Sequence, residues 1–212
     1  MGLFEALDDL GLDVTPEAIV QLEKLVDELL RWNRRRNLTA IVERDEILEK
    51  HLVDSLTLLP FIGRTGRLLD IGSGAGFPAL PLKIARPDLE IVSVDAVGKK
   101  IDFQRHIARS FGLDGFTALH ERFESLVDHA DYCQAFEVVT ARALCTLGEL
   151  QAMARPFLAP GGRLMAMKGP GGSEEIAALS GQSRESGWSA TVHRLKLPVS
   201  GADRCLIEIE YL

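Results

Sequence analysis

The stretch Leu68-Leu69-Asp70-Ile71-Gly72-Ser73-Gly74-Ala75-Gly76-Phe77 decides the fold class of this chain. An apolar run of strand character leads into a loop with glycine at every second position, and the loop leads into a segment of helical pattern. Gly72 and Gly74 would let the backbone approach a ligand closely, because no Cβ stands in the way. The loop amides and the helix N-terminus would supply hydrogen-bond donors. The pattern predicts a ligand site at the carboxyl end of a buried parallel strand.

The spacing of the glycines separates two classes of ligand. A dinucleotide fingerprint, GxGxxG, would need glycine at position 77, where this chain has Phe77. The third glycine is Gly76, and GxGxG after an acid-bearing strand is the usual form in methyltransferases. Asp95 ends the next predicted strand, about where an acid that holds ribose hydroxyls is expected. These features together favour a nucleoside site over the alternative, in which the glycines only make a tight turn and Asp95 caps a helix.

Predicted strands and helices alternate along the rest of the chain. Strands are expected at 67–71, 90–94, 116–120, 136–140, 163–168, 190–197 and 204–211. Helices are expected at 78–85, 99–111 and 147–158, the last one stopped by Pro160-Gly161-Gly162. The alternation implies an α/β fold with a mostly parallel seven-stranded sheet, helices on both faces and an antiparallel hairpin or edge at the C-terminus.

A helical segment precedes this alternating part. Thr15-Pro16-Glu17 combines an N-cap, a proline at the first helical position and an early acid. Asp45 is expected to cap another helix, which the 63–66 region would end. We therefore expect an N-terminal helical extension over 1–62 and a Rossmann-like class I methyltransferase domain over 63–212.

Bulk composition narrows the function classes. No apolar run approaches the ~20 residues that span a bilayer, and the acidic first 14 residues do not resemble a signal peptide, so we expect a cytoplasmic protein. The formal net charge of −7 argues against coating of nucleic acid by charge alone, but it allows a local basic patch to dock on RNA. Cys133, Cys145 and Cys205 lie far apart in apolar stretches, which predicts buried free thiols and no metal site.

Several further motifs make the chain resemble one known family. They are Trp32-Asn33, Asn37-Leu38-Thr39-Ala40-Ile41, His51-Leu52-Val53-Asp54-Ser55-Leu56, the GFPALPLKI run from Gly76, Lys99-Lys100, Glu121-Arg122-Phe123-Glu124, Thr140-Ala141-Arg142-Ala143, and Gly161-Gly162 followed by Lys168-Gly169. With these motifs the chain resembles the RsmG (GidB) family of bacterial methyltransferases, which methylate N7 of one guanine in 16S ribosomal RNA. The resemblance covers nearly the whole chain. One departure is Ala79, where the family usually has glycine.

The resemblance implies a cofactor, a partner and a set of site residues. The cofactor would be S-adenosylmethionine, with S-adenosylhomocysteine as product, and the partner of a monomeric enzyme would be 16S rRNA or the small ribosomal subunit. Phe123 and Glu124 would form an adenine-binding pair, although a helix start with one core aromatic is the alternative. Arg142 is the expected catalytic residue, because it follows the fourth strand and its planar fork could bind a phosphate or orient a base. The expected cofactor-binding residues are Gly72, Gly74, Gly76, Phe77, Asp95, Phe123, Glu124 and Arg142.

The chemistry of this reaction needs few catalytic groups. Guanine N7 has a lone pair and no proton, so it can attack a sulfonium methyl group without a general base. Positioning and cleft electrostatics would supply most of the catalysis. His51 belongs to the HLVDS element and is the histidine to test for a role, with packing of the N-terminal helices as the alternative.

Arginines near the end of the first long helix are candidates for RNA binding. Arg34, Arg35 and Arg36 adjoin Trp32, which suggests a patch for phosphates and stacked bases, and Lys100 would add charge from the domain. The alternative is a solvated helix end whose cations suit the helix dipole. The RNA interpretation is favoured because the patch leads directly into the NLTAI element.

Three other functions stay open at the level of sequence. A class I methyltransferase acting on another RNA, a protein or a small molecule would share the cofactor site. Phe77 and the lack of a catalytic Tyr/Lys or His/Asp pair weigh against an NAD-dependent oxidoreductase. The intact glycine loop and Asp95 weigh against a non-catalytic binding module.

Overall fold

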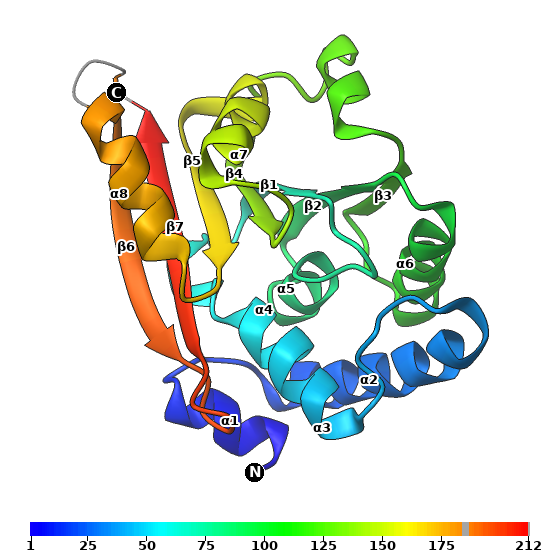
Figure 1. Ribbon diagram of the computed structural model, residues 1–212. Helices are drawn as coiled ribbons and strands as arrows, with labels where there is room; N and C mark the ends of the chain where they lie inside the picture. The colour runs from blue at the N-terminus through cyan, green and yellow to red at the C-terminus, as the bar shows by residue number, and fades with distance from the viewer. Residues whose placement is uncertain (184–186, 212) are drawn as a thin grey trace.

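A seven-stranded sheet forms the centre of the computed structural model, which describes residues 1–183 and 187–211 (Figure 1). The strand order is β3-β2-β1-β4-β5-β7-β6. β1 to β5 run parallel, and β7 pairs antiparallel with both β5 and β6. The predicted α/β fold with a mostly parallel sheet and an antiparallel C-terminal edge is confirmed. The strands are β1 Gly66–Ile71, β2 Leu89–Asp95, β3 Phe116–His120, β4 Phe136–Arg142, β5 Leu158–Lys168, β6 Trp188–Lys196 and β7 Asp203–Tyr211.

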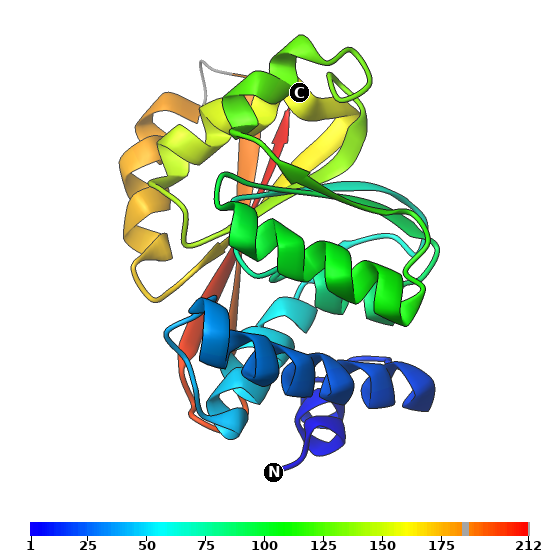
Figure 2. The same cartoon turned by 90° about the vertical axis from the view of Figure 1, so that its right-hand side faces the viewer.

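Helices cover both faces of the sheet, as Figure 2 shows. Successive strand side chains point to opposite faces, so Leu68 packs with α5 (Ala79–Ala85) and α6 (Gly98–Phe111), while Leu69 packs with α7 (Leu147–Ala154) on the other face. α8 (Gly172–Ser183) lies beside α7 on that second face and contacts β6 and β7. The central strands β1, β2 and β4 are therefore buried on both sides, which explains their largely apolar sequences.

The N-terminal segment adds helices to the α5–α6 face. It contains α1 (Leu3–Asp9), α2 (Pro16–Arg36), α3 (Arg44–Ile47), a π-helical turn (Leu48–Val53) and α4 (Asp54–Leu56). α2 begins as predicted, with the Thr15 hydroxyl accepting a hydrogen bond from the Ala18 amide at 3.2 Å. Apolar side chains of α2, such as Leu22 and Leu29, join the same core as α5, so the extension and the sheet share one apolar interior.

Several predicted boundaries were wrong. The helix expected to reach residue 158 ends at Ala154 and continues as a 3₁₀ turn, Arg155–Phe157, because Pro156 has no amide hydrogen to extend the α-helical hydrogen bonds. Pro160-Gly161-Gly162 therefore lie inside β5, where Phe136 pairs with Leu158 but Val138 pairs with Arg163, so β5 bulges. α8 was not predicted.

Two smaller expectations also fail. Asp45 does not cap a helix, because α3 begins at Arg44 with Glu43 in the N-cap position, which leaves Asp45 in the first turn. Only Cys205 of the three free thiols is buried, while Cys133 and Cys145 are partly exposed.

Candidate active site

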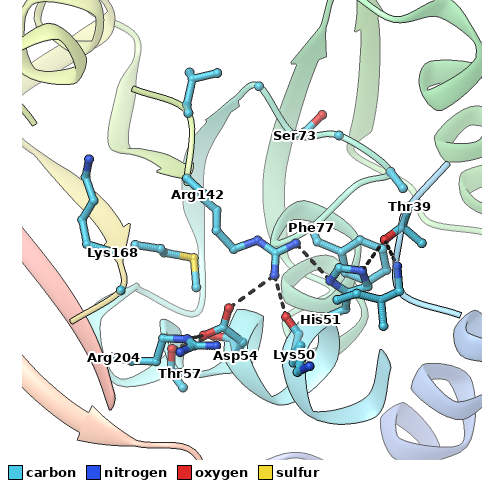
Figure 3. Close-up of a pocket in the computed structure, with 18 of the residues that line it drawn as sticks. Thr39, Lys50, His51, Asp54, Thr57, Ser73, Phe77, Arg142, Lys168 and Arg204 are labelled. Carbon is cyan, nitrogen blue, oxygen red and sulfur yellow. Dashed lines mark hydrogen bonds and ion pairs between the residues drawn. The ribbon is translucent and has the colours of Figure 1, made fainter. Parts of the chain in front are cut away.

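A cavity of about 660 Å³ opens at the carboxyl edge of the sheet, between the glycine loop, the end of β4 and the helical extension (Figure 3). Its size lies within the range of small-molecule sites in proteins. Gly72 and Gly74 line it from the loop, Arg142 from β4, and Thr39 and His51 from the extension. Segments far apart in the sequence thus share one site.

The glycine loop has a backbone conformation that glycine favours. Gly72, Gly74 and Gly76 have φ values of +69°, +60° and +92°. The Asp95 carboxylate fixes the loop from the end of β2, because its two oxygens accept hydrogen bonds from the amides of Gly74 and Val97, each at 2.8 Å. Asp95 thus lines the cavity and orders the turn that precedes α6, but it does not cap that helix, whose N-cap residue is Val97.

The third glycine has a different neighbourhood from the other two. A Cβ on Gly76 would lie 2.6 Å from Leu80 Cδ1 and 3.1 Å from Gln104 Cγ, both in the protein interior. Gly76 is not among the residues that line the cavity. Its absent side chain lets the loop pack closely against α5 and α6, whereas Gly72 and Gly74 expose backbone to the cavity.

A buried polar chain holds the loop from behind. The Ser93 hydroxyl donates to Gln104 Oε1 at 2.6 Å, and Gln104 Nε2 donates to the Ser73 hydroxyl and to the Gly74 carbonyl, each at 2.8 Å. Ser93 and Gln104 are fully buried. A satisfied buried network of this kind favours a single loop conformation.

Asp70 lies fully buried beneath the loop. Oδ2 accepts a hydrogen bond from the Ala79 amide at 3.2 Å, and Oδ1 has no hydrogen-bond partner among the described residues. Burial raises the pKa of this carboxyl from 3.8 to about 7. Asp70 does not line the cavity, so the fit to a nucleoside rests on Gly72 and Gly74, whose backbone faces the cavity, and on the Asp95 carboxylate beside them. Ala79, the departure from the family pattern, supplies that amide at the start of α5.

Arg142 is the centre of the opposite wall of the cavity. Its Nη1 donates to the Lys50 carbonyl at 2.8 Å and lies 3.3 Å from Asp54 Oδ2, and its Nη2 lies 3.2 Å from Nδ1 of His51. The guanidinium carbon is 5.9 Å from the centroid of the Phe77 ring. Figure 3 shows the guanidinium between the imidazole and the Asp54 carboxylate.

His51 is stacked on Phe77, with ring centroids 4.7 Å apart and an interplanar angle of 19°. Its Nε2 lies 3.0 Å from the Thr39 hydroxyl. Burial, and secondarily the charge of Arg142, lowers the pKa of His51 from 6.5 to about 4. The imidazole is therefore neutral at pH 7.

A π-helical turn shapes this wall. The amide of Asp54 bonds to the carbonyl of Glu49, five residues back, rather than to that of Lys50, four residues back. The Lys50 carbonyl accepts the hydrogen bond from Arg142 instead. Asp54 also accepts a hydrogen bond from Nε of Arg204 at 2.8 Å, so one buried carboxylate serves two guanidinium groups.

Positive charge exceeds negative charge around the cavity, although the whole chain carries −7. Five cationic side chains line it against the two carboxylates Asp54 and Asp95. The cations are Lys50, Lys100, Arg142, Lys168 and Arg204. Lys168 is held at 2.9 Å by Glu175 and donates to the Cys145 carbonyl, while Arg142 and Arg204 share Asp54. Such an excess favours anionic ligands.

Some of the expected site residues lie away from the cavity. Phe123 and Glu124 begin a 3₁₀ helix, Phe123–Asp128, after β3 and are not among the lining residues; Phe123 packs partly buried against the α7-side core. Arg35 and Arg36 line a separate hollow of about 470 Å³ with Trp32 and His106, while Arg34 lines another beside Asn37. Lys100 lines the main cavity, so the four expected RNA-binding residues are not brought together.

Sequence reasoning missed part of the Arg142 wall. The Lys50 carbonyl has no sequence signal, and neither does Arg204, which lies 150 positions from its partner Asp54. The spacing of His51 and Asp54 is a signal, because residues three apart on a helix share a face. Among the described residues no three His, Cys, Asp or Glu side chains gather as a metal site requires.

The sheet order, the glycine loop at its carboxyl edge and the acid that ends β2 define a class I methyltransferase fold. An rRNA methylase from Streptococcus thermophilus matches it with a TM-score of 0.55 at 13% identity, over 82% of this chain and 99% of that chain. TYW2 from M. jannaschii, solved in complex with AdoMet, matches with a TM-score of 0.58 at 10% identity, over 75% of each chain.

The chain belongs to the GidB family, rRNA small subunit methyltransferase G, whose model matches residues 18–197. The ribosomal RNA small subunit methyltransferase G of Syntrophotalea carbinolica is 48% identical over 209 residues, which cover 98% of this chain and 96% of the relative. That of Geobacter sulfurreducens is 43% identical over 210 residues, 99% of this chain and 96% of the relative. The resemblance inferred from the motifs is confirmed. Within the described part of the chain, no helix has the length and apolar character to cross a membrane.

Proposed function

We propose that the chain transfers a methyl group from S-adenosylmethionine to N7 of one guanine in 16S ribosomal RNA. The observation that carries this proposal is the cavity itself, where a glycine loop with exposed backbone faces an arginine held by the helical extension. The family relatives are named as methyltransferases of small-subunit rRNA, and a structural neighbour was solved with AdoMet.

The loop side of the cavity suits the cofactor. S-adenosylmethionine, when bound, supplies a methyl group activated by a sulfonium. Gly72 and Gly74 would approach it with their backbone, and Asp95 would accept hydrogen bonds from its ribose. Phe123 and Glu124 would contact the adenine. Their support is the sheet register: Asp95 pairs with His120, only three positions before Phe123.

The Arg142 side suits an anionic group. The guanidinium of Arg142 is a planar cation, and its orientation is set by three groups of the extension. It would bind the cofactor carboxylate or an RNA phosphate at the edge of the target base. Because N7 has no proton to lose, neutral His51 is not required as a base, and catalysis depends on aligning N7 with the methyl group.

RNA would reach the cavity across the extension. The expected contacts are Arg34, Arg35 and Arg36 at the end of α2, together with Lys100 at the cavity itself. Trp32 shares a hollow with Arg35 and Arg36, and this combination of an aromatic ring and cations suits single-stranded RNA. We propose that the enzyme acts as a monomer in the cytoplasm, on 16S rRNA or on the small ribosomal subunit.

The test is to incubate the protein with labelled S-adenosylmethionine and unmodified small-subunit RNA, and to map the methylated nucleotide. We expect label at a single guanine, on N7, in naked RNA or in the small subunit. Proteins and metabolites from the same cells serve as competing acceptors. Label on those acceptors and none on the RNA would contradict the proposal and favour a different methyltransferase.

A further inference from the structure

We propose that His51 is a positioning residue for Arg142, and that its neutral imidazole ties this arginine to the turn at the end of α2. The inference deepens the proposed function and rests on it, because it gives Arg142 its place in the cofactor cleft. It assigns to the HLVDS element a role beyond the packing of helices.

The first argument is where the partners of Arg142 come from. Among the described residues, its hydrogen-bond partners are the Lys50 carbonyl, the Asp54 carboxylate and the His51 ring, all within one helical segment of the extension. β4 places Arg142 at the cavity, but the hydrogen-bond partners in the extension orient its guanidinium. Of the three partners, the imidazole alone also contacts the glycine loop, through the stacked Phe77 ring.

The second argument is the direction of the hydrogen bonds. A guanidinium can only donate, so Nδ1 of His51 must be an unprotonated acceptor. The proton then lies on Nε2 and points to the Thr39 hydroxyl, 3.0 Å away. Charged groups around the ring are Arg142 from β4, with Lys50 and Asp54 from its own segment, while Phe77 and Thr39 are uncharged. Protonation of Nδ1 would place two donors and two positive charges face to face.

The third argument is that Thr39, the hydrogen-bond partner of His51 Nε2, is itself held in place. Asn33 Oδ1 accepts hydrogen bonds from the amides of Leu38 at 2.6 Å and Thr39 at 3.0 Å, and Asn33 Nδ2 donates to the Thr39 carbonyl at 3.0 Å. Asn37 has a φ of +46°, which ends α2 and starts the turn. A chain of hydrogen bonds from Asn33 through Thr39 and His51 to Arg142 therefore connects the arginine-rich end of α2 with the cofactor cleft.

Three substitutions separate positioning from packing. His51→Asn keeps an acceptor oxygen near the place of Nδ1, His51→Gln keeps a donor near the place of Nε2, and His51→Leu keeps volume with neither. We expect His51→Leu to weaken S-adenosylhomocysteine binding about tenfold, as for one lost hydrogen bond to a charged group, and to lower kcat more than it raises KM. His51→Asn should recover most of the affinity, and His51→Gln little of it.

Calorimetry with S-adenosylhomocysteine measures the affinities without any RNA. Equal affinities of the Asn, Gln and Leu variants, or of all three and the parent chain, would overturn the proposal. If His51→Leu does not fold, the Asn and Gln pair still gives the comparison. If His51→Asn recovers the affinity but the parent chain methylates no RNA, the positioning role stands and the proposed substrate is rejected.

A spectroscopic measurement tests the tautomer directly. In ¹⁵N NMR of the imidazole at pH 7, we expect Nδ1 to have the shift of an unprotonated nitrogen and Nε2 that of a protonated one. The opposite assignment, or a charged ring, would overturn the proposal, because neither form can accept from Arg142 at Nδ1.

Discussion

The two walls of the cavity are built in different ways. The glycine-loop wall consists of loop backbone and a carboxylate from the adjacent strand, held by a buried polar chain that runs from Ser73 and Gly74 through Gln104 to Ser93. The Arg142 wall consists of side chains from β4, β7 and the extension that meet on Asp54 and His51. The loop wall depends on local backbone conformation, and the Arg142 wall on contacts between distant segments.

Each wall contains a buried ionisable group, and the pKa values of these two groups are shifted in opposite directions. Burial raises the pKa of Asp70 to about 7, and burial beside Arg142 lowers that of His51 to about 4. Both groups thus prefer their uncharged form. The charge of each wall lies in groups that line the cavity, such as Asp95, Asp54 and Arg142.

The largest effect is expected where one carboxylate holds the Arg142 wall together. Asp54→Ala would leave Arg142 and Arg204 without their shared anion, and breaking a buried pair in this way costs about 3 kcal/mol or more. Urea unfolding of the variant measures this loss. Asp54→Asn, which keeps the shape and one acceptor, should lose less. A loss below about 1 kcal/mol in Asp54→Ala would mean that solvent already screens the cluster.

The next prediction concerns the pH dependence of stability, which differs between the two walls. The pKa of Asp70 is raised on folding, so its contribution is complete below pH 3.8 and is lost as pH rises through about 7. This shift changes the free energy of unfolding by about 4 kcal/mol across that pH range. Asp70→Asn cannot ionise and should be more stable than the parent at pH 8, with a difference that shrinks toward pH 5.

His51 has the opposite sign. Its pKa is lowered on folding, so its contribution is complete above pH 6.5 and is lost as pH falls through about 4. In the parent chain the two slopes oppose each other over the same range. Unfolding free energies of Asp70→Asn and His51→Asn, measured from pH 4 to 8, should reveal each slope alone. Slopes of the same sign in both variants would show that one of the two groups titrates differently from this account.

The predictability of the two walls from sequence follows their construction. Gly72, Gly74 and Asp95 could be predicted because a strand, a glycine loop and a terminal acid occur within 28 consecutive residues, 68–95. Such a motif reflects requirements of the local backbone conformation. Arg142 came from the family resemblance, but its partners did not, since Asp54 lies 88 positions away and the Lys50 carbonyl depends on a π-helical turn. The early end of α7 had a local signal in Pro156 that the Pro-Gly-Gly run obscured.

A smaller effect is expected at the loop wall itself. Asp95→Asn keeps the side-chain shape but removes the charge that Gly74, Val97 and the ribose hydroxyls would share. We expect S-adenosylhomocysteine affinity to fall about tenfold, or ~1.4 kcal/mol. Asp102→Asn, on the exposed side of α6, is the matched control and should bind like the parent. Unchanged affinity in Asp95→Asn would remove the ribose role.

The smallest effect on the cavity is expected from the end of α2. Arg34→Ala with Arg35→Ala should weaken RNA binding and flatten its salt dependence by about two phosphate contacts, while S-adenosylhomocysteine affinity stays the same. Lys24→Ala, an exposed cation earlier on α2, is the control. Filter binding over a salt series and calorimetry give the two affinities. Loss of cofactor binding in the double variant would contradict this separation of the RNA contacts from the cofactor cavity.

A crystal structure with S-adenosylhomocysteine tests the central claim most directly, because that claim places one nucleoside between the two walls. We predict the nucleoside against Gly72 and Gly74, its ribose hydroxyls on Asp95 and its amino-acid end toward Arg142. A ligand bound outside this cavity, or a glycine loop closed over Asp95 with Arg142 turned away from the ligand, would contradict the account.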